Sequence, residues 1–443
     1  MRESLFLLLV VATSYLAAHV VFERLARRFG LVSGAEYLVL GLVLGPEVSG
    51  LMPPHAVESF SPLITLGLGW IGALIGTQLV LPKLVRIPAV RYRVAFGEAL
   101  FALLAMGGIF YAILRWGSGW SEAESLAVAA ALSLVSLPAS SAGVGIVARS
   151  QTTRTILVPQ LEVATTLQAV LASAGLAVLF TILHDSPTSL ARPLVPTEWM
   201  AITLAIGIVG GTLFHIFIGE EKKVDRLFIS LSGAIILVSG AAAALSLSPV
   251  FAALVFGAIL GNTRGSRAEI VAALSRVERP FYFALFIFAG ASWKPSERDW
   301  LLLVAAFVVV RPLLRVGAAR LAARMNRMLP DLGPNWGRGL IGHGGFALVL
   351  ALDYLRQGGV PAPHVVFTAT VASLLLTDAV SARLVRSVLR QPTSFASGEF
   401  RRFEGAAVAP AQAAPGESAP AVGAADATTA SGAPTPARQE EPS

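Results

Sequence analysis

The sequence contains no cysteine and few charged residues. Without cysteine, disulfide bonds and metal sites built from thiolates are excluded. Charged residues make up 14% of the 443 residues, whereas soluble domains carry about 25%. Hydrophobic residues account for 55% of the chain and the mean hydropathy is +0.71, so apolar side chains stand where charges are missing. This composition predicts a protein that crosses a membrane several times.

Catalytic motifs are missing as well. The chain has no HExxH motif, no GxSxG motif and no paired intramembrane aspartates, which argues against an intramembrane enzyme. No glycine-rich nucleotide fingerprint follows the last apolar segment. We therefore expect neither enzyme activity nor a bound cofactor.

Long apolar segments fill most of the chain up to residue 392. A helix needs about 20 largely apolar residues to cross a bilayer, because lipid cannot satisfy exposed backbone groups. The sequence predicts an all-α polytopic membrane domain over residues 1–392, with about 13 transmembrane helices. The predicted spans lie near residues 4–22, 31–51, 61–80, 94–115, 124–147, 157–183, 198–219, 227–245, 249–262, 279–293, 300–323, 338–356 and 363–388.

The positive residues indicate an orientation, since arginine and lysine in short loops stay on the cytoplasmic side. They follow every second span, which places the N-terminus outside and the C-terminus in the cytoplasm, in a cell (inner) membrane. The net charge of +7 is therefore a topology signal, and nucleic-acid binding is not implied. The positive clusters include Arg24, Arg27, Arg28, Lys83, Arg86, Arg149, Arg154, Lys222, Lys223, Arg264, Arg267, Arg320, Arg324, Arg383 and Arg386.

Residues 393–443 differ in composition from the rest. This segment is rich in Ala, Pro, Gly, Ser and Thr, as in AAPGESAPAVGAADATTASGAPTPARQEEPS. It lacks the apolar periodicity that would bury a core. We expect a disordered cytoplasmic tail.

Four ionisable residues inside predicted spans stand out: Glu98, Glu162, Arg311 and His343. Such residues are costly in a bilayer and are therefore candidates for function. Glu98 lies about four residues from the cytoplasmic end of its span, and we expect its carboxylate either to reach the interface or to be bonded locally. Arg311 lies roughly 17 Å deep, near the midplane, where its permanent charge needs partners. These partners are either groups that take part in transport or the carbonyls of a broken helix.

Two spans contain helix-breaking residues. In SLVSLPASSAGVGIV, Pro138 follows Ser136 and removes a helical hydrogen bond. In GLIGHGGFALVL, Gly342, Gly344 and Gly345 surround His343. Broken helices at membrane depth line cavities, and their ends form ion and substrate sites in transporters built from inverted repeats. The sequence predicts such a transporter.

Five segments occur in the order and spacing of one family. They are YLVLGLVLGPEVSG, the SLP at Ser136 to Pro138, FAALVFGAILGN, RPFYFALFIFAGASW and GHGGFALVLAL. Over roughly residues 5–390 the chain resembles the monovalent cation/proton antiporters, which include sodium/proton exchangers and potassium-efflux proteins. Arg311 falls where this family carries lysine or arginine. The resemblance implies 13 helices in a dimerisation domain and a core domain, two crossed broken helices, an elevator-like motion and a homodimer.

The chain departs from this family at its ion-binding pair. The resemblance places an Asp-Asp, Asn-Asp or Gln-Asp pair at Thr166 and Leu167, where this chain has threonine and leucine. Glu162 matches a glutamate that some exchangers carry four residues earlier, and His343 stands where they carry its arginine partner. The chain therefore resembles an exchanger that keeps the supporting carboxylate and has lost the main one.

Equal depth suggests a contact between Glu162 and His343. Each lies about five residues, roughly 8 Å, from the cytoplasmic end of its span. We hypothesise a proton-titratable pair that faces the cytoplasmic cavity, with Thr165, Thr166 and Ser136 offering neutral oxygens to an ion. The alternative is a buried acid-base pair that only orders the core.

Two functions remain open at the level of sequence. The first is secondary transport that exchanges a monovalent cation, Na⁺ or K⁺, for protons, with Glu162 in place of the absent aspartate. The second is a transporter fold without cation/proton coupling, which handles an anionic or neutral solute or serves as a sensor or regulatory membrane subunit. Arg311 without the usual aspartate favours the second.

Overall fold

The computed structural model describes residues 34–117, 119–140, 157–184, 193–218, 221, 223–263, 267–294 and 300–389. The predicted span near residues 4–22, the end of the span predicted at 124–147, and the predicted tail 393–443 lie outside these ranges.

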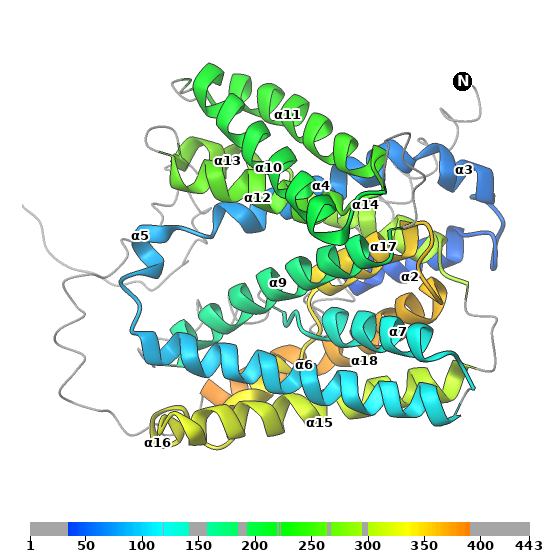
Figure 1. Ribbon diagram of the computed structural model, residues 1–443, viewed down its shortest axis with the longest axis vertical. Coiled ribbons are helices and arrows are strands. Elements are labelled where there is room, and N and C mark those ends of the chain that lie inside the picture. The colour runs from blue at the N-terminus through cyan, green and yellow to red at the C-terminus, as the bar shows by residue number, and fades with distance from the viewer. Residues whose placement is uncertain are drawn as a thin grey trace, which may run out of the picture. The chain divides into compact units, whose positions relative to one another are not determined.

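Every regular element in the described ranges is a helix, which confirms the all-α prediction. The elements are α2 Ala35–Leu44, α3 Pro54–Ser59, α4 Ser61–Thr77, α5 Leu81–Leu84, α6 Ala89–Gly117, α7 Glu122–Ser136, α9 Leu157–Ile182, α10 Pro196–Ile218, α11 Val224–Ala244, α12 Pro249–Asn262, α13 Arg267–Arg276, α14 Glu278–Ala291, α15 Leu301–Met325, α16 Leu329–Leu332, the 3₁₀ helix η2 Trp336–Leu340, α17 Gly345–Arg356 and α18 Pro363–Leu389. Figure 1 shows their arrangement.

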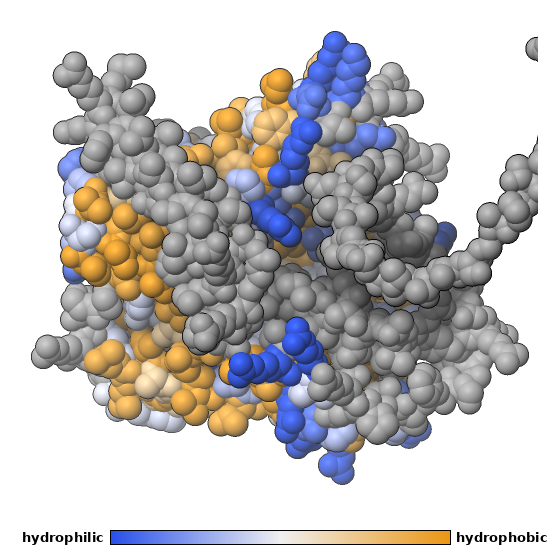
Figure 2. Space-filling view, turned by 180° about the vertical axis from the view of Figure 1, so that it is seen from behind, coloured by the Kyte–Doolittle hydropathy of each residue, from blue (hydrophilic) through white to orange (hydrophobic). Residues whose placement is uncertain are grey.

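Several of these helices have the length and composition of membrane spans. Five are long and apolar enough to cross a bilayer: α6, α9, α10, most of α11, and α15. Shorter apolar helices of 10–17 residues, among them α4 and α12, are present as well. Large apolar side chains such as Leu302 and Leu313 are 82% and 68% exposed, and Figure 2 shows broad hydrophobic areas on the surface. A surface of this kind is expected where lipid replaces water as the solvent.

One group of helices packs closely through glycine. Helices α4, α10, α11, α12 and α13, here called the scaffold bundle, share an apolar core that includes Trp70 and Phe256. Along the α4–α12 contact the backbones touch, because a Cβ atom at Gly257 would lie 2.0 Å from the Ala73 carbonyl oxygen. A Cβ atom at Gly76 would likewise lie 2.1 Å from the Leu254 oxygen. Only glycine permits this approach.

Replacing Gly257 with alanine is expected to push α4 and α12 apart and to lower stability by about 1 to 3 kcal/mol, the usual cost of overpacking. The matched control is Gly240→Ala in α11, because a Cβ atom there meets no atom within 4 Å. The control should keep or slightly raise stability, since alanine favours helix. Thermal unfolding in detergent compares the two. Equal melting temperatures would contradict the close packing.

A second group of helices is here called the crossing bundle. It consists of α6, α7 and α9 and then of α15, η2 with α17, and α18. Each set of three has a discontinuous element between two long helices, as expected for inverted repeats. Helices α6 and α15 lie side by side in Figure 1, and Phe110 and Phe307 meet there with ring centroids 5.8 Å apart.

Local sequence explains where the discontinuous elements start and stop. Helix α7 begins with a capping box, in which Ser121 Oγ accepts from Glu124 N at 3.3 Å and Glu124 Oε2 accepts from Ser121 N at 3.2 Å. It ends at Ser136, two residues before Pro138, because proline cannot continue the hydrogen-bond ladder. Helix η2 ends at Leu340, just before the glycine-rich stretch from which α17 starts.

Candidate functional site

The two discontinuous elements cross at their breaks. Residues 136–140 and 341–344, here called the crossing, run antiparallel and pair through an isolated bridge between Ala139 and His343. Ser140 N donates to Gly342 O at 2.9 Å, and Gly344 N donates to Pro138 O at 3.3 Å. These bonds pair the two predicted breaks inside the helical bundle; the chain that follows the first break, residues 141–156, lies outside the described residues.

Glycine is required on one side of the crossing. A Cβ atom at Gly344 would lie 2.7 Å from the Ala139 oxygen, and one at Gly342 would lie 2.2 Å from Ser381 Oγ. Gly345 opens α17 and packs beside the rings of Tyr282 and Phe286, where a Cβ atom would have contacts of 3.3 Å. The glycines around His343 therefore allow the two backbones to meet.

Arg311 joins the two breaks. Its side chain comes from α15 and the residue is 1% exposed. Nε donates to Ser136 O at 2.9 Å, and Nη1 donates to Ile341 O at 2.6 Å. Both carbonyls lie at helix ends, where they lack helical partners and carry the negative end of the helix dipole. Arg311 thus binds carbonyls of both broken helices, one of the two alternatives that the sequence left open.

A second buried arginine lies one turn further along α15. Arg315 Nη1 donates to Glu98 Oε1 at 2.7 Å, and these side chains are 2% and 0% exposed. Arg315 Nη2 donates to Gln168 Oε1 at 3.1 Å and also to the Leu137 carbonyl. Gln168 Nε2 in turn donates to Glu98 Oε2 at 2.7 Å. Arg315, Glu98 and Gln168 form a closed polar triad against the crossing.

This triad decides between the two expectations for Glu98. The carboxylate does not reach the interface: the residue is 0% exposed and both of its oxygens accept bonds inside the bundle. Its partners come from α9 and α15, two helices that distance along α6 cannot reveal. Among the residues that the structure describes, Glu98 is the carboxylate that pairs with an arginine beside the crossing.

The charges around the crossing are unequal. In the described ranges, two guanidinium groups face one carboxylate. Arginine does not lose its proton in proteins, so both positive charges are permanent. Arg311 Nη2 and Arg315 Nε have no hydrogen-bond partner among the described residues, which leaves N–H donors beside the crossing.

His343 faces α7. Its Nε2 lies 2.8 Å from Val135 O, and because a carbonyl only accepts, this nitrogen carries the proton. The backbone N of His343 donates to Thr377 Oγ1 at 3.0 Å, and its ring lies 6.3 Å from that of Phe307. The residue is 0% exposed. Both the main chain and the ring of His343 are therefore held.

The expected contact between Glu162 and His343 is not formed. Glu162 is exposed on α9, while His343 is buried against Val135. No hydrogen bond or ion pair links their side chains in the part of the chain that the structure describes. The reason is direction: equal depth does not fix the side of a helix or break from which a side chain projects.

The three predicted hydroxyl ligands have different surroundings. Ser136 Oγ donates to Ser133 O at 2.6 Å, and Thr165 Oγ1 donates to Glu162 O at 3.1 Å. Thr166 is half-buried. Ser136 and Thr165 use their hydrogens within their own helices, so each hydroxyl oxygen keeps lone pairs for a cation.

Arg315 and Gln168 were not recognised from the sequence. Arg315 follows Arg311 by four residues, a spacing that puts both on one face of a helix. Gln168 directly follows Leu167, where the family resemblance places an aspartate. The i, i+4 arginine spacing was the available signal.

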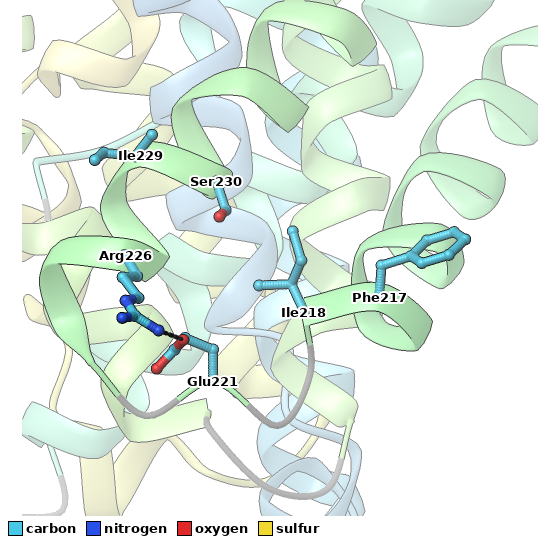
Figure 3. A pocket seen from close by; sticks show the side chains of 6 residues that line it. All are labelled: Phe217, Ile218, Glu221, Arg226, Ile229 and Ser230. Carbon is cyan, nitrogen blue, oxygen red and sulfur yellow. Dashed lines mark hydrogen bonds and ion pairs between the residues drawn. The ribbon is translucent and has the colours of Figure 1, made fainter.

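A cavity of the described part lies away from the crossing. It has a volume of about 580 Å³ and lies between the facing ends of α10 and α11. Figure 3 shows Arg226 and Glu221 pointing toward each other there, 3.3 Å apart, with Phe217 turned away from the pair. The cavity is lined by Phe217, Ile218, Glu221, Arg226, Ile229 and Ser230, and no residue of the crossing contributes to it.

Solved structures support the fold. No protein-family model matches the sequence, and a search of curated proteins gives no match. The structure is similar to that of the sodium/proton antiporter MjNhaP1 from Methanocaldococcus jannaschii at pH 8, with a TM-score of 0.63 and 16% identity over 88% of this chain and 99% of that chain. A second structure of MjNhaP1 matches with a TM-score of 0.61 and 15% identity over the same shares. The chain is an all-α membrane protein with the fold of a sodium/proton antiporter.

Proposed function

We propose that the protein is a secondary transporter that exchanges a monovalent cation, Na⁺ or K⁺, for protons by alternating access. The observation that carries this proposal is the buried carboxylate of Glu98 beside two crossed broken helices. Exchange requires a group that binds either a proton or a cation, and Glu98 supplies that group on α6. The antiporter fold supports the same conclusion.

The triad links the binding of a proton or cation at Glu98 to the contacts of a broken helix. Ionised Glu98 accepts from both Arg315 and Gln168, so a proton or a cation must compete with Arg315 for the carboxylate. Arg315 also holds the carbonyl of Leu137, just past the end of α7. A change at Glu98 therefore alters the contacts of a broken helix, and the strength of those contacts differs between the occupied and empty states.

We assign supporting roles to the other predicted residues. The exposed carboxylate of Glu162 attracts cations toward the crossing, and Thr165, Thr166 and Ser136 provide neutral oxygens on the way. Arg311 and His343 hold the two breaks in register through carbonyls on both of them. We also expect a homodimer in the cell membrane, with the N-terminus outside and the C-terminus cytoplasmic.

One observation favours a second candidate. The two buried guanidinium groups exceed the single carboxylate, and N–H groups of both are unpartnered within the described ranges. An anionic solute would satisfy these donors. The alternative function is therefore transport of an anionic solute on the same fold without cation/proton coupling.

The test is dissipation of a preset pH gradient by the pure protein in proteoliposomes. We expect Na⁺ or K⁺, but not choline, to collapse the gradient in the native protein, and Glu98→Gln to abolish the response because the amide binds no proton. Glu58→Gln, at an exposed residue of α3, is the control. A gradient that responds to no cation, with the protein shown to be inserted, would reject the proposal and lead to a panel of anions.

A further inference from the structure

Asp353 is a buried acid that the proposed exchange does not use. It lies in the second half of α17, eight residues after the helix start at Gly345, or about 12 Å from the crossing. The residue is 2% exposed. Burying an aspartate is costly unless its carboxyl group is hydrogen-bonded or paired, and such a residue is a candidate for function. The groups around Asp353 are therefore informative.

The partner of Asp353 belongs to the scaffold bundle. Ser248 Oγ donates to Asp353 Oδ2 at 2.6 Å. Ser248 is also the N-cap of α12, because its Oγ accepts from Phe251 N at 3.1 Å. One serine hydroxyl therefore joins the start of a scaffold helix to the carboxylate of a broken helix.

Two neighbours of Asp353 reach across the same boundary. Gln357 Nε2 donates to the carbonyl of Ser246, in the α11–α12 turn. Arg356 Nη2 donates to Ser61 Oγ at the start of α4. Asp353, Arg356 and Gln357 thus dock the end of α17 on the scaffold bundle through three polar contacts.

The scaffold side of this docking site is a hydrogen-bonded turn. Ser246 has φ 53°, a left-handed conformation that is uncommon for a residue other than glycine. Leu247 N donates to Ala242 O at 2.9 Å, which closes the turn back onto α11. This turn presents the Ser246 carbonyl and the Ser248 hydroxyl to the end of α17.

The charged groups near Asp353 are few. On its own helix, Arg356 acts on it through space while its guanidinium bonds to Ser61. The α11–α12 turn offers the hydroxyl of Ser248 and the carbonyl of Ser246, and α4 offers Ser61. No ion pair to Asp353 is formed in the ranges described. The carboxylate is therefore held by a neutral hydroxyl, a partner that leaves room for a proton.

We propose that Asp353 is a second proton-binding site, separate from Glu98, whose protonation decides whether α17 stays docked on the α11–α12 turn. This inference rests on the proposed alternating access, in which the crossing bundle moves relative to the scaffold bundle. Docked Asp353 is buried, and undocked Asp353 meets water. Burial disfavours the charged form of a carboxyl group. Low pH on the side of the membrane where α17 ends therefore favours the docked state, and high pH favours release.

The absence of native cysteines allows the docking to be measured without transport. Nitroxide labels at Leu245→Cys and Gly358→Cys flank the contact; Leu245 is 40% exposed, and a side chain at Gly358 meets no atom within 4 Å. Dipolar broadening between the labels, recorded from acid to alkaline pH in proteoliposomes, gives the docked fraction. One linked proton changes the docked-to-open ratio by at most about tenfold per pH unit.

We expect the labelled native protein to shift from docked to open as pH rises, and Asp353→Asn to remove the shift. Asp225→Asn is the control, because Asp225 has an 87% exposed side chain on α11. Ser248→Ala keeps the acid and removes its partner, so it should favour the open state at every pH. A native protein without a pH response, or an unchanged response in Asp353→Asn, would overturn the inference. Failure of cation exchange alone would leave the label response intact, so the two proposals fail separately.

Discussion

Replacing Arg315 with methionine is expected to lower the free energy of unfolding by about 3 to 5 kcal/mol, the cost of breaking a buried ion pair from one side. Arg315 Nη1 lies 2.7 Å from Glu98 Oε1, and neither side chain has appreciable exposure. The variant leaves the carboxylate with Gln168 as its remaining partner. Thermal unfolding of the pure protein in detergent measures the loss.

Matched controls distinguish the loss of the Arg315–Glu98 ion pair from the effect of replacing any arginine of α15. Arg324→Met changes an exposed arginine of the same helix and should leave the melting temperature nearly unchanged. The double variant Glu98→Met with Arg315→Met removes both charges and should recover most of the stability, because well-packed apolar pairs replace buried ion pairs at little cost. If Arg315→Met has the same melting temperature as the native protein, the triad does not contain a stabilising buried ion pair.

Replacing Arg311 with methionine is expected to slow transport by about 100-fold or more. The change removes two charged hydrogen bonds, to Ser136 O and Ile341 O, each worth roughly 1.5 to 3 kcal/mol. Both carbonyls then lose their partner inside the bundle, and the two breaks lose their common tie. Transport rates in proteoliposomes, normalised to inserted protein, provide the measurement.

Lysine at position 311 distinguishes charge from geometry. Arg311→Lys keeps a positive charge but not the planar fork that reaches two carbonyls at once, so we expect an intermediate rate. Arg226→Met, whose side chain is 68% exposed at the α10–α11 end, serves as the control and should transport normally. Native rates in Arg311→Met would show that the crossing holds without this residue.

The breaks were predictable because they depend on local chemistry. Pro138 ends α7 wherever the rest of the chain lies, and Gly342 and Gly344 permit a close approach that no other residue allows. The depth of Arg311 likewise follows from rise per residue. Its demand for partners predicted the bonds to broken-helix carbonyls, although not which carbonyls.

Partners on other helices could not be predicted in the same way. The environment of Glu98 depends on Arg315 and Gln168, which are 217 and 70 residues away in sequence. Asp353 depends on Ser248, 105 residues away. Distance from a helix end gives depth but not rotation, and rotation decides whether a carboxylate faces lipid, water or an arginine.

The expected contact of Glu162 with His343 failed for a related reason. Glu162 lies on a regular helix, whereas His343 lies in an extended break, where helical periodicity does not set side-chain direction. The bond of its backbone N to Thr377 and the bond of its ring to Val135 orient His343 instead. Its position in the sequence predicted a place at the break, and only the crossing geometry determines where the ring points.

Competition between protons and a cation at Glu98 is the central claim, and proton release from the pure protein tests it most directly. Na⁺ or K⁺ is added to protein in weakly buffered detergent solution, and the pH change is recorded for the native chain, Glu98→Gln and Glu162→Gln. We expect the native protein and Glu162→Gln to release protons on addition of the transported cation, and Glu98→Gln to release none. Equal release from Glu98→Gln and the native protein would contradict the account.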